Sequence, residues 1–115
     1  MSVIIFHNPG CSKSRQTLEL LEKHGITPTI IEYLKTPPTV KKLKEILAQL
    51  GFVSRDLMRK KEAIYSEYEL DNPALSNDDL IGFMIKHPVL IERPIVLANG
   101  KAALGRPPEQ VLEIL

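Results

Sequence analysis

The sequence predicts an α/β domain in which a strand–helix–strand unit is followed by a group of helices, a pair of strands and a final helix. Short runs of β-branched and aromatic residues alternate with longer stretches of helical period, which is the pattern of a mixed fold. An Asn-Gly pair between two strand-like runs near the C-terminal end indicates a hairpin. The 115 residues, 43% of them apolar, are enough for one buried core, so we expect a single domain over residues 1–115.

The first three elements are expected to form a βαβ unit. Residues 3–6 are a short apolar run that ends at His7, and Asn-Pro-Gly at residues 8–10 breaks it. A helical period then extends over residues 12–24, and residues 29–33 have the composition of a second strand. A strand, a helix and a strand within about thirty residues form a right-handed crossover, which predicts that the two strands are parallel.

The middle of the chain is predicted to be a helical insertion over about residues 37–90. Its apolar stripe repeats at helical spacing and comprises Leu43, Ile46, Leu47 and Leu50. Ser54 is expected to cap a short helix, whereas residues 62–73 are polar and are expected to be irregular. Residues 76–79, Ser-Asn-Asp-Asp, form a capping box for a helix that stops before Pro88.

The C-terminal part is predicted to be a hairpin followed by a helix. Residues 95–98 and 101–104 are strand-like, and Asn99-Gly100 between them is the signature of a type I′ turn. Pro108 suits the first turn of a helix that carries the last apolar residues. The whole order of elements matches a thioredoxin-like βαβ-ββα core with a helical insertion between the second and third strands.

Composition excludes several classes of function. The formal net charge is +1, with 15 Lys and Arg against 14 Asp and Glu, which argues against a nucleic-acid binder or a membrane-surface protein. A single cysteine excludes an internal disulfide and a Cys-rich zinc site, and the spacing of that cysteine and the histidines suggests no metal site. No signal or membrane-spanning segment is evident, so we expect a cytoplasmic protein whose thiol is kept reduced.

Cys11 lies between the end of the first predicted strand and the start of the first helix. The helix dipole and the free N–H groups favour an anion there, and the nearby Lys13, Arg15 and His7 also favour the thiolate. The alternative is a small buried apolar cysteine, but the position after a Pro-Gly turn favours a reactive one. His7 is either a partner of the thiolate or a strand-end histidine bonded to the backbone, and Ser14 either donates to an anion or simply starts the helix.

Arginine residues are expected to gather near this thiol. Arg93 precedes Pro94 at the start of the third predicted strand, where thioredoxin-like folds carry a cis proline that faces the active cysteine. Arg106 leaves the fourth predicted strand on the same side, and Arg59 comes from the insertion. Several planar guanidinium donors suit a tetrahedral oxyanion, although an arginine taken singly is more often a solvated surface residue.

Several motifs in one order make the chain resemble the glutaredoxin-coupled arsenate reductase family, ArsC, over nearly its whole length. The resemblance is carried by residues 7–15 (HNPGCSKSR), 33–39 (YLKTPPT), 57–60 (LMRK), 87–96 (HPVLIERPIV) and 105–107 (GRP). It implies that Cys11 is the nucleophile and that His7 and Ser14 support the thiolate. It also implies an oxyanion site made of Arg59, Arg93 and Arg106.

The function implied by this resemblance is the reduction of arsenate to arsenite. One thiol cannot supply both electrons of that reduction, so glutathione is expected as co-substrate and glutaredoxin as the partner that clears the mixed disulfide. No bound cofactor or metal is expected. A glutathione-dependent thiol reductase of the same fold is an alternative. A further one is a regulatory module similar to Spx, which binds RNA polymerase, but such regulators typically carry Cys-x-x-Cys and Ser14 stands at the second position here.

Overall fold

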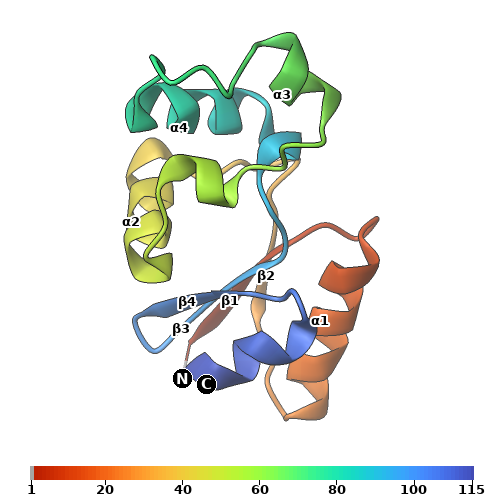
Figure 1. Cartoon of the computed structure of the whole chain (residues 1–115). Coiled ribbons are helices and arrows are strands. Elements are labelled where there is room, and N and C mark those ends of the chain that lie inside the picture. Colours follow the sequence, from red (N-terminus) through yellow and green to blue (C-terminus); the bar gives the residue numbers. More distant parts are fainter. Residues whose placement is uncertain (1) are drawn as a thin grey trace. The chain divides into compact units, whose positions relative to one another are not determined.

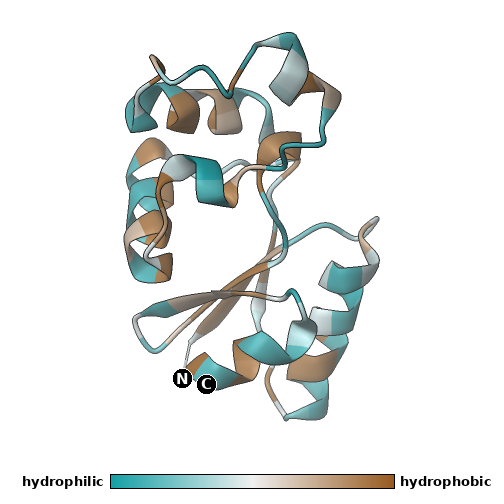
Figure 2. Cartoon of the chain, in the orientation of Figure 1, coloured by the Kyte–Doolittle hydropathy of each residue, from teal (hydrophilic) through white to brown (hydrophobic). Residues whose placement is uncertain are grey.

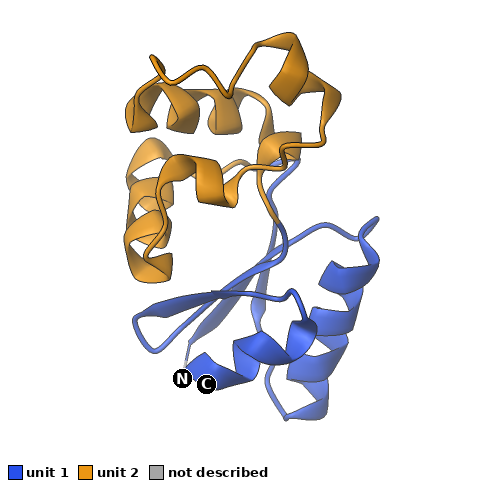
Figure 3. Ribbon diagram, viewed as in Figure 1, with its two compact units in different colours: residues 1–36, 93–115 blue, residues 37–92 orange. Residues whose placement is uncertain are grey.

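The computed structural model describes residues 2–115, which fold as two compact units (Figures 1 and 3). Unit 1 comprises the residues up to 36 together with residues 93–115, and unit 2 comprises residues 37–92. Unit 2 is thus inserted, in sequence, between the second and third strands of unit 1. None of the helices within residues 2–115 is both long and apolar enough to cross a lipid bilayer.

Unit 1 is built on a sheet of four strands in the order β2-β1-β3-β4. The strands are β1 (Val3–His7), β2 (Thr29–Glu32), β3 (Ile95–Ala98) and β4 (Lys101–Leu104). β1 pairs with β2 in parallel and with β3 antiparallel, which confirms the predicted βαβ unit. β3 and β4 form the predicted hairpin, and Asn99 and Gly100 have φ of 54° and 72°, as a type I′ turn requires.

Two helical segments complete unit 1, namely α1 (Ser12–Lys23), which connects β1 to β2, and η3 (Pro108–Ile114), which follows β4. The strands are predominantly apolar (Figure 2), and the core of the unit centres on fully buried Ile5, Leu21, Val96 and Val111. This is the predicted thioredoxin-like α/β arrangement.

The final helix is 3₁₀ and not the expected α-helix. Its buried residues are Pro108, Val111 and Ile114, which repeat every three positions. Side chains three residues apart eclipse one another in a 3₁₀-helix, so this tighter coil turns all three toward the core. A 3₁₀ run of seven residues is longer than usual, because the hydrogen-bond geometry of this form is poorer than that of an α-helix.

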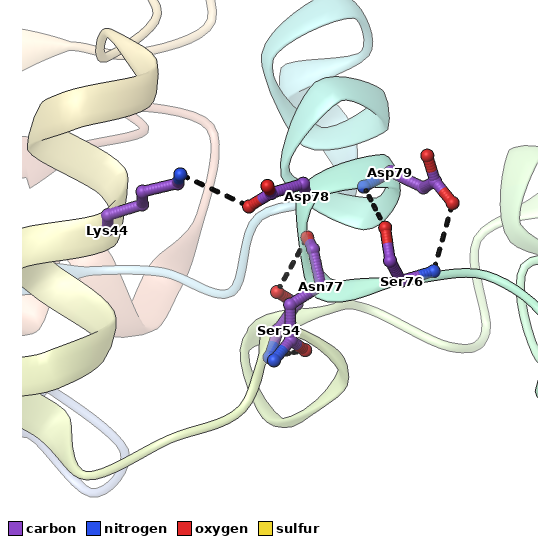
Figure 4. A network of polar contacts seen from close by, with 6 residues as sticks. All are labelled: Lys44, Ser54, Ser76, Asn77, Asp78 and Asp79. Carbon is purple, nitrogen blue, oxygen red and sulfur yellow. Dashed lines mark hydrogen bonds and ion pairs between the residues drawn. The ribbon is translucent and has the colours of Figure 1, made fainter.

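Unit 2 is helical, as predicted. It contains α2 (Val40–Leu50), η1 (Ser54–Leu57), α3 (Ala63–Glu67), α4 (Asn77–Lys86) and η2 (Pro88–Leu90). Thr39 caps α2 by accepting the N–H of Lys42 at 3.1 Å, and Gly51 ends the helix with a φ of 70°. The predicted capping box is present on α4: Ser76 Oγ accepts the N–H of Asp79, and Asp79 Oδ2 accepts the N–H of Ser76 (Figure 4).

Two local predictions in unit 2 were wrong. Ser54 does not cap η1 but is its first residue, and its buried hydroxyl donates to the backbone oxygen of Asn77 at 3.1 Å (Figure 4). The expected irregular stretch contains α3, because Tyr65 and Leu70 are both buried and so anchor this polar segment. The first error follows from a contact with a residue 23 positions away, and the second from two apolar residues within a mostly polar stretch.

Two glycines provide a matched test of packing in the two units. A Cβ added at Gly105 would lie 2.7 Å from Pro94 Cγ and closer still to Thr17 Oγ1, whereas a Cβ added at Gly82 on α4 would meet nothing. Gly105→Ala is therefore expected to lower the free energy of unfolding by about 1–3 kcal/mol through overpacking. Gly82→Ala is expected to raise it by about 0.5–1 kcal/mol through helix propensity. Urea denaturation measures both, and a Gly105→Ala variant as stable as the wild type would contradict this account.

Candidate active site

The site lies at the end of the sheet where β1 stops and β3 begins. Because β1 and β3 are antiparallel with Phe6 opposite Ile95, the turn after β1 adjoins the residues just before β3. The pairing of Ile95 with Leu104 brings the residues after β4 to the same end. Topology thus gathers Cys11, the segment before β3 and the segment after β4 from distant parts of the sequence.

Cys11 is the N-cap residue of α1, in an extended conformation with a φ of −101°. It is 9% exposed, and the N–H groups at the start of α1 face its sulfur without forming a capping hydrogen bond of full geometry. Asn8-Pro9-Gly10 forms the turn before it, and the N–H of Cys11 donates to the backbone oxygen of Asn8 at 3.0 Å. The sulfur therefore lies where the first N–H groups of a helix attract an anion.

The pKa of the Cys11 thiol is below its ordinary value. Burial is the largest single influence and acts to raise the pKa. It is outweighed by the backbone N–H groups of Ser14 and Lys13, which face the sulfur, and by Arg93, which acts through its charge and through its side-chain donors. The fold thus favours the thiolate, which is the nucleophilic form of cysteine.

His7 and Ser14 form a buried pair beneath this turn. His7 Nδ1 lies 2.6 Å from Ser14 Oγ, which also accepts the N–H of Asn8 at 3.0 Å. The pKa of His7 is lowered, first by burial and further by Arg15, with Glu32 acting in the opposite direction. His7 is therefore mostly uncharged at neutral pH, and Ser14 reaches the sulfur through its backbone N–H while its hydroxyl serves His7 and Asn8.

Two arginines of unit 1 meet beside the thiol. Arg106 Nη1 lies 4.0 Å from Cys11 Sγ and donates to the backbone oxygen of Arg93 at 3.2 Å. The Arg93–Pro94 peptide bond is cis, as predicted. The Arg106–Pro107 bond is also cis. This second cis bond was not predicted, although both bonds join an arginine to a proline. The N–H of Gly105 donates to the backbone oxygen of Pro94 at 3.0 Å, so the two arginine segments are tied to each other.

Arg15 and Arg59 have other contacts. Arg15 Nη1 donates to the backbone oxygen of Pro9 at 2.8 Å and so holds the turn from outside. Arg59 belongs to unit 2, where its guanidinium donates to the backbone oxygen of Val89 at 3.3 Å and pairs with Glu62 at 3.4 Å. Its predicted part in binding an oxyanion stays a prediction.

The arrangement in unit 1 is suited to holding a tetrahedral anion against a nucleophile. Helix N–H groups and planar guanidinium groups bind such anions, and a thiolate with a lowered pKa lies among them. Within residues 2–115, no group of three or more His, Cys, Asp and Glu side chains is placed to hold a metal ion. Fold and site together define a thioredoxin-like protein with one activated cysteine next to arginine groups.

Comparison with known proteins identifies the family. The family model described as the ArsC family matches residues 6–114, and the chain belongs to that family. An arsenate reductase of Neisseria meningitidis serogroup A is 54% identical over 112 residues, with 96% of each chain covered. An arsenate reductase of Escherichia coli is 46% identical over 114 residues, which are 99% of this chain and 81% of that protein. The solved structure of an arsenate reductase from Vibrio cholerae matches with a TM-score of 0.98 and 58% identity, over 100% of this chain and 98% of that one.

The lowered pKa of Cys11 predicts how its reactivity depends on pH. The rate of alkylation by iodoacetamide should rise with a midpoint below about 8.5, the value of a free cysteine. Because the pKa is lower in the folded than in the unfolded chain, ionisation also stabilises the fold. That contribution is complete above the unfolded pKa and is lost as the pH falls through the folded one. A midpoint at or above that of free cysteine would contradict the lowered pKa of Cys11. The Cys11→Ser variant gives the background rate of alkylation at other residues.

Proposed function

We propose that this protein reduces arsenate to arsenite at Cys11. The observation that carries the proposal is the placement of the Cys11 thiolate at a helix N-terminus beside Arg93 and Arg106. Membership of the ArsC family and close relatives named arsenate reductase support it. Arsenate has the shape and charge of phosphate, so the same N–H and guanidinium donors suit it.

In the proposed first step, the Cys11 thiolate attacks arsenic. A sulfur–arsenic bond forms, an arsenic–oxygen bond breaks, and the departing hydroxide takes a proton and leaves as water. Arg93 and Arg106 stabilise the negative charge on the remaining oxygens as the adduct forms. Arg59 is proposed as a third ligand of the oxyanion on the family resemblance alone.

The second step requires a thiol from outside the chain, because Cys11 is the only cysteine. Glutathione is the proposed donor. Its sulfur bonds to the Cys11 sulfur, the sulfur–arsenic bond breaks and its electron pair stays with arsenic, which leaves as arsenite. Each sulfur of the new disulfide has lost one electron and arsenic has gained two. Glutaredoxin then reduces the mixed disulfide, so we also propose a reducing compartment such as the cytoplasm as the place of reaction.

The direct test is arsenite formation by the purified protein with arsenate and glutathione, with and without glutaredoxin. We expect turnover that requires glutathione and increases with glutaredoxin. Activity on a glutathione mixed disulfide without any arsenite would reject arsenate as substrate and select the thiol reductase alternative. Turnover with an unrelated reductant but not with glutathione would reject the proposed electron donor.

A further inference from the structure

Three polar groups of Asn8 form hydrogen bonds within the turn that precedes Cys11. Its backbone N–H donates to Ser14 Oγ, and its backbone oxygen accepts the N–H of Cys11, both at 3.0 Å. Its side-chain Oδ1 accepts the N–H of Gly10 at 2.9 Å. A Cβ added at Gly10 would lie only 3.3 Å from the same Oδ1, so a glycine there leaves room for this close contact.

These bonds divide the N–H groups of the turn into two sets. The N–H groups of Gly10 and Cys11 are directed at Asn8. The N–H groups of Lys13 and Ser14, which follow at the start of α1, face the sulfur and act to lower its pKa. The position of the sulfur relative to these N–H groups depends on the shape of the turn, since Cys11 is the residue that joins the turn to α1.

We propose that Asn8 is a positioning residue for Cys11, because its side-chain carbonyl and its backbone oxygen hold the turn that places the sulfur at the N-terminus of α1 beside Arg106. The inference rests on the proposed function in one respect, namely that Cys11 is the nucleophile. The bond from Arg15 to the backbone oxygen of Pro9 braces the same turn from its outer side.

The chain offers a matched control for the side-chain bond. Asn72 Oδ1 accepts the N–H of Ala74 at 2.9 Å, which is the same kind of bond at the same length, but in unit 2. The experiment compares Asn8→Ala and Asn72→Ala in the full chain by the rate of alkylation of Cys11 with iodoacetamide from pH 5 to 10. We expect Asn8→Ala to slow alkylation at pH 7 by about threefold to tenfold, since less thiolate is present. Asn72→Ala should react like the wild type.

A second variant separates the shape of the turn from its charge. Asn8→Asp retains a side-chain oxygen for the N–H of Gly10, so hydrogen exchange of the Gly10 amide should stay slow, whereas in Asn8→Ala it should become fast. The new carboxylate also disfavours the thiolate, but high salt should reduce this effect because salt screens exposed charges. The defect of Asn8→Ala should persist in salt.

Equal alkylation profiles for Asn8→Ala and Asn72→Ala would overturn the inference. So would a wild-type profile in an Asn8→Ala variant whose Gly10 amide exchanges fast, because the turn would then have loosened without any effect on the sulfur. The proposed function can fail separately. If the wild type forms no arsenite but Asn8→Ala still slows alkylation, arsenate is the wrong substrate and Asn8 still positions the thiol.

Discussion

Cys11→Ser is expected to lower arsenate reduction by about a thousandfold or more while leaving the binding of arsenate intact. The serine hydroxyl occupies nearly the same volume, but it is not ionised in the pH range in which the lowered pKa of Cys11 yields a thiolate. Loss of a nucleophile removes the covalent route, and only binding and charge stabilisation remain. The helix N–H groups and the arginines are unchanged, so anion affinity should be preserved.

Two measurements on that variant check both halves of the expectation. Arsenite formation with glutathione and glutaredoxin gives the loss of turnover, and isothermal titration with arsenate gives the dissociation constant. Residual turnover of several per cent would mean that Cys11 is not the nucleophile. A complete loss of arsenate binding, with an unchanged urea midpoint, would mean that the thiolate itself holds the anion.

Arg106→Ala is expected to lower kcat/KM for arsenate by about a hundredfold, which is typical for the loss of one donor to a developing oxyanion. Arg106 is exposed apart from its contacts with Cys11 Sγ and the backbone oxygen of Arg93, so the fold should lose little stability. Since Arg106 also holds the Arg93 segment, the effects of Arg93→Ala and Arg106→Ala should not add in the double variant.

Further variants separate the contribution of the charge of Arg106 from that of its donor geometry. Arg106→Lys keeps the charge but loses the planar fork of donors, so its kcat/KM should fall between those of the wild type and Arg106→Ala. Lys101→Ala removes an exposed cation from the start of β4, whereas Arg106 follows the end of that strand, so this variant should leave kcat/KM unchanged. If Lys101→Ala lowered kcat/KM as much as Arg106→Ala, the effect would come from the net charge of the protein. The proposed role of Arg106 in binding the oxyanion near Cys11 would then be wrong.

The features that were predictable from the sequence depend on neighbours within a few residues. The type I′ turn at Asn99-Gly100 and the capping box at Ser76 are complete within four residues, and both are present. The position of Cys11 at a helix start follows from the same kind of signal, since a Pro-Gly turn separates a strand from a helical period. The four strands and the parallel βαβ unit could also be predicted, because their signals lie in short stretches of sequence.

The features that were missed are decided by contacts between distant residues. The hydroxyl of Ser54 bonds to a residue 23 positions away, and the choice between capping and burial cannot be made from the residues next to it. Lys13 and Arg15 suggested a positive charge at the thiol, but Arg15 binds the oxygen of Pro9 and Lys13 acts through its backbone N–H. Arg93 and Arg106 were predicted to lie near Cys11 from their places at the start of the third strand and after the fourth, whereas the role of Arg59, which belongs to unit 2, stays a prediction.

The separation of Cys11 from Arg106 by 95 positions has a consequence for biosynthesis. The ribosome delivers the thiol well before its cationic neighbours, because Arg93 and Arg106 both belong to the second sequence segment of unit 1. Until that segment emerges and pairs with β1, the thiol lacks these cations and its acidity is nearer to that of an ordinary cysteine. We therefore expect the thiol to gain the full acidity of the folded site only after this segment has paired with β1.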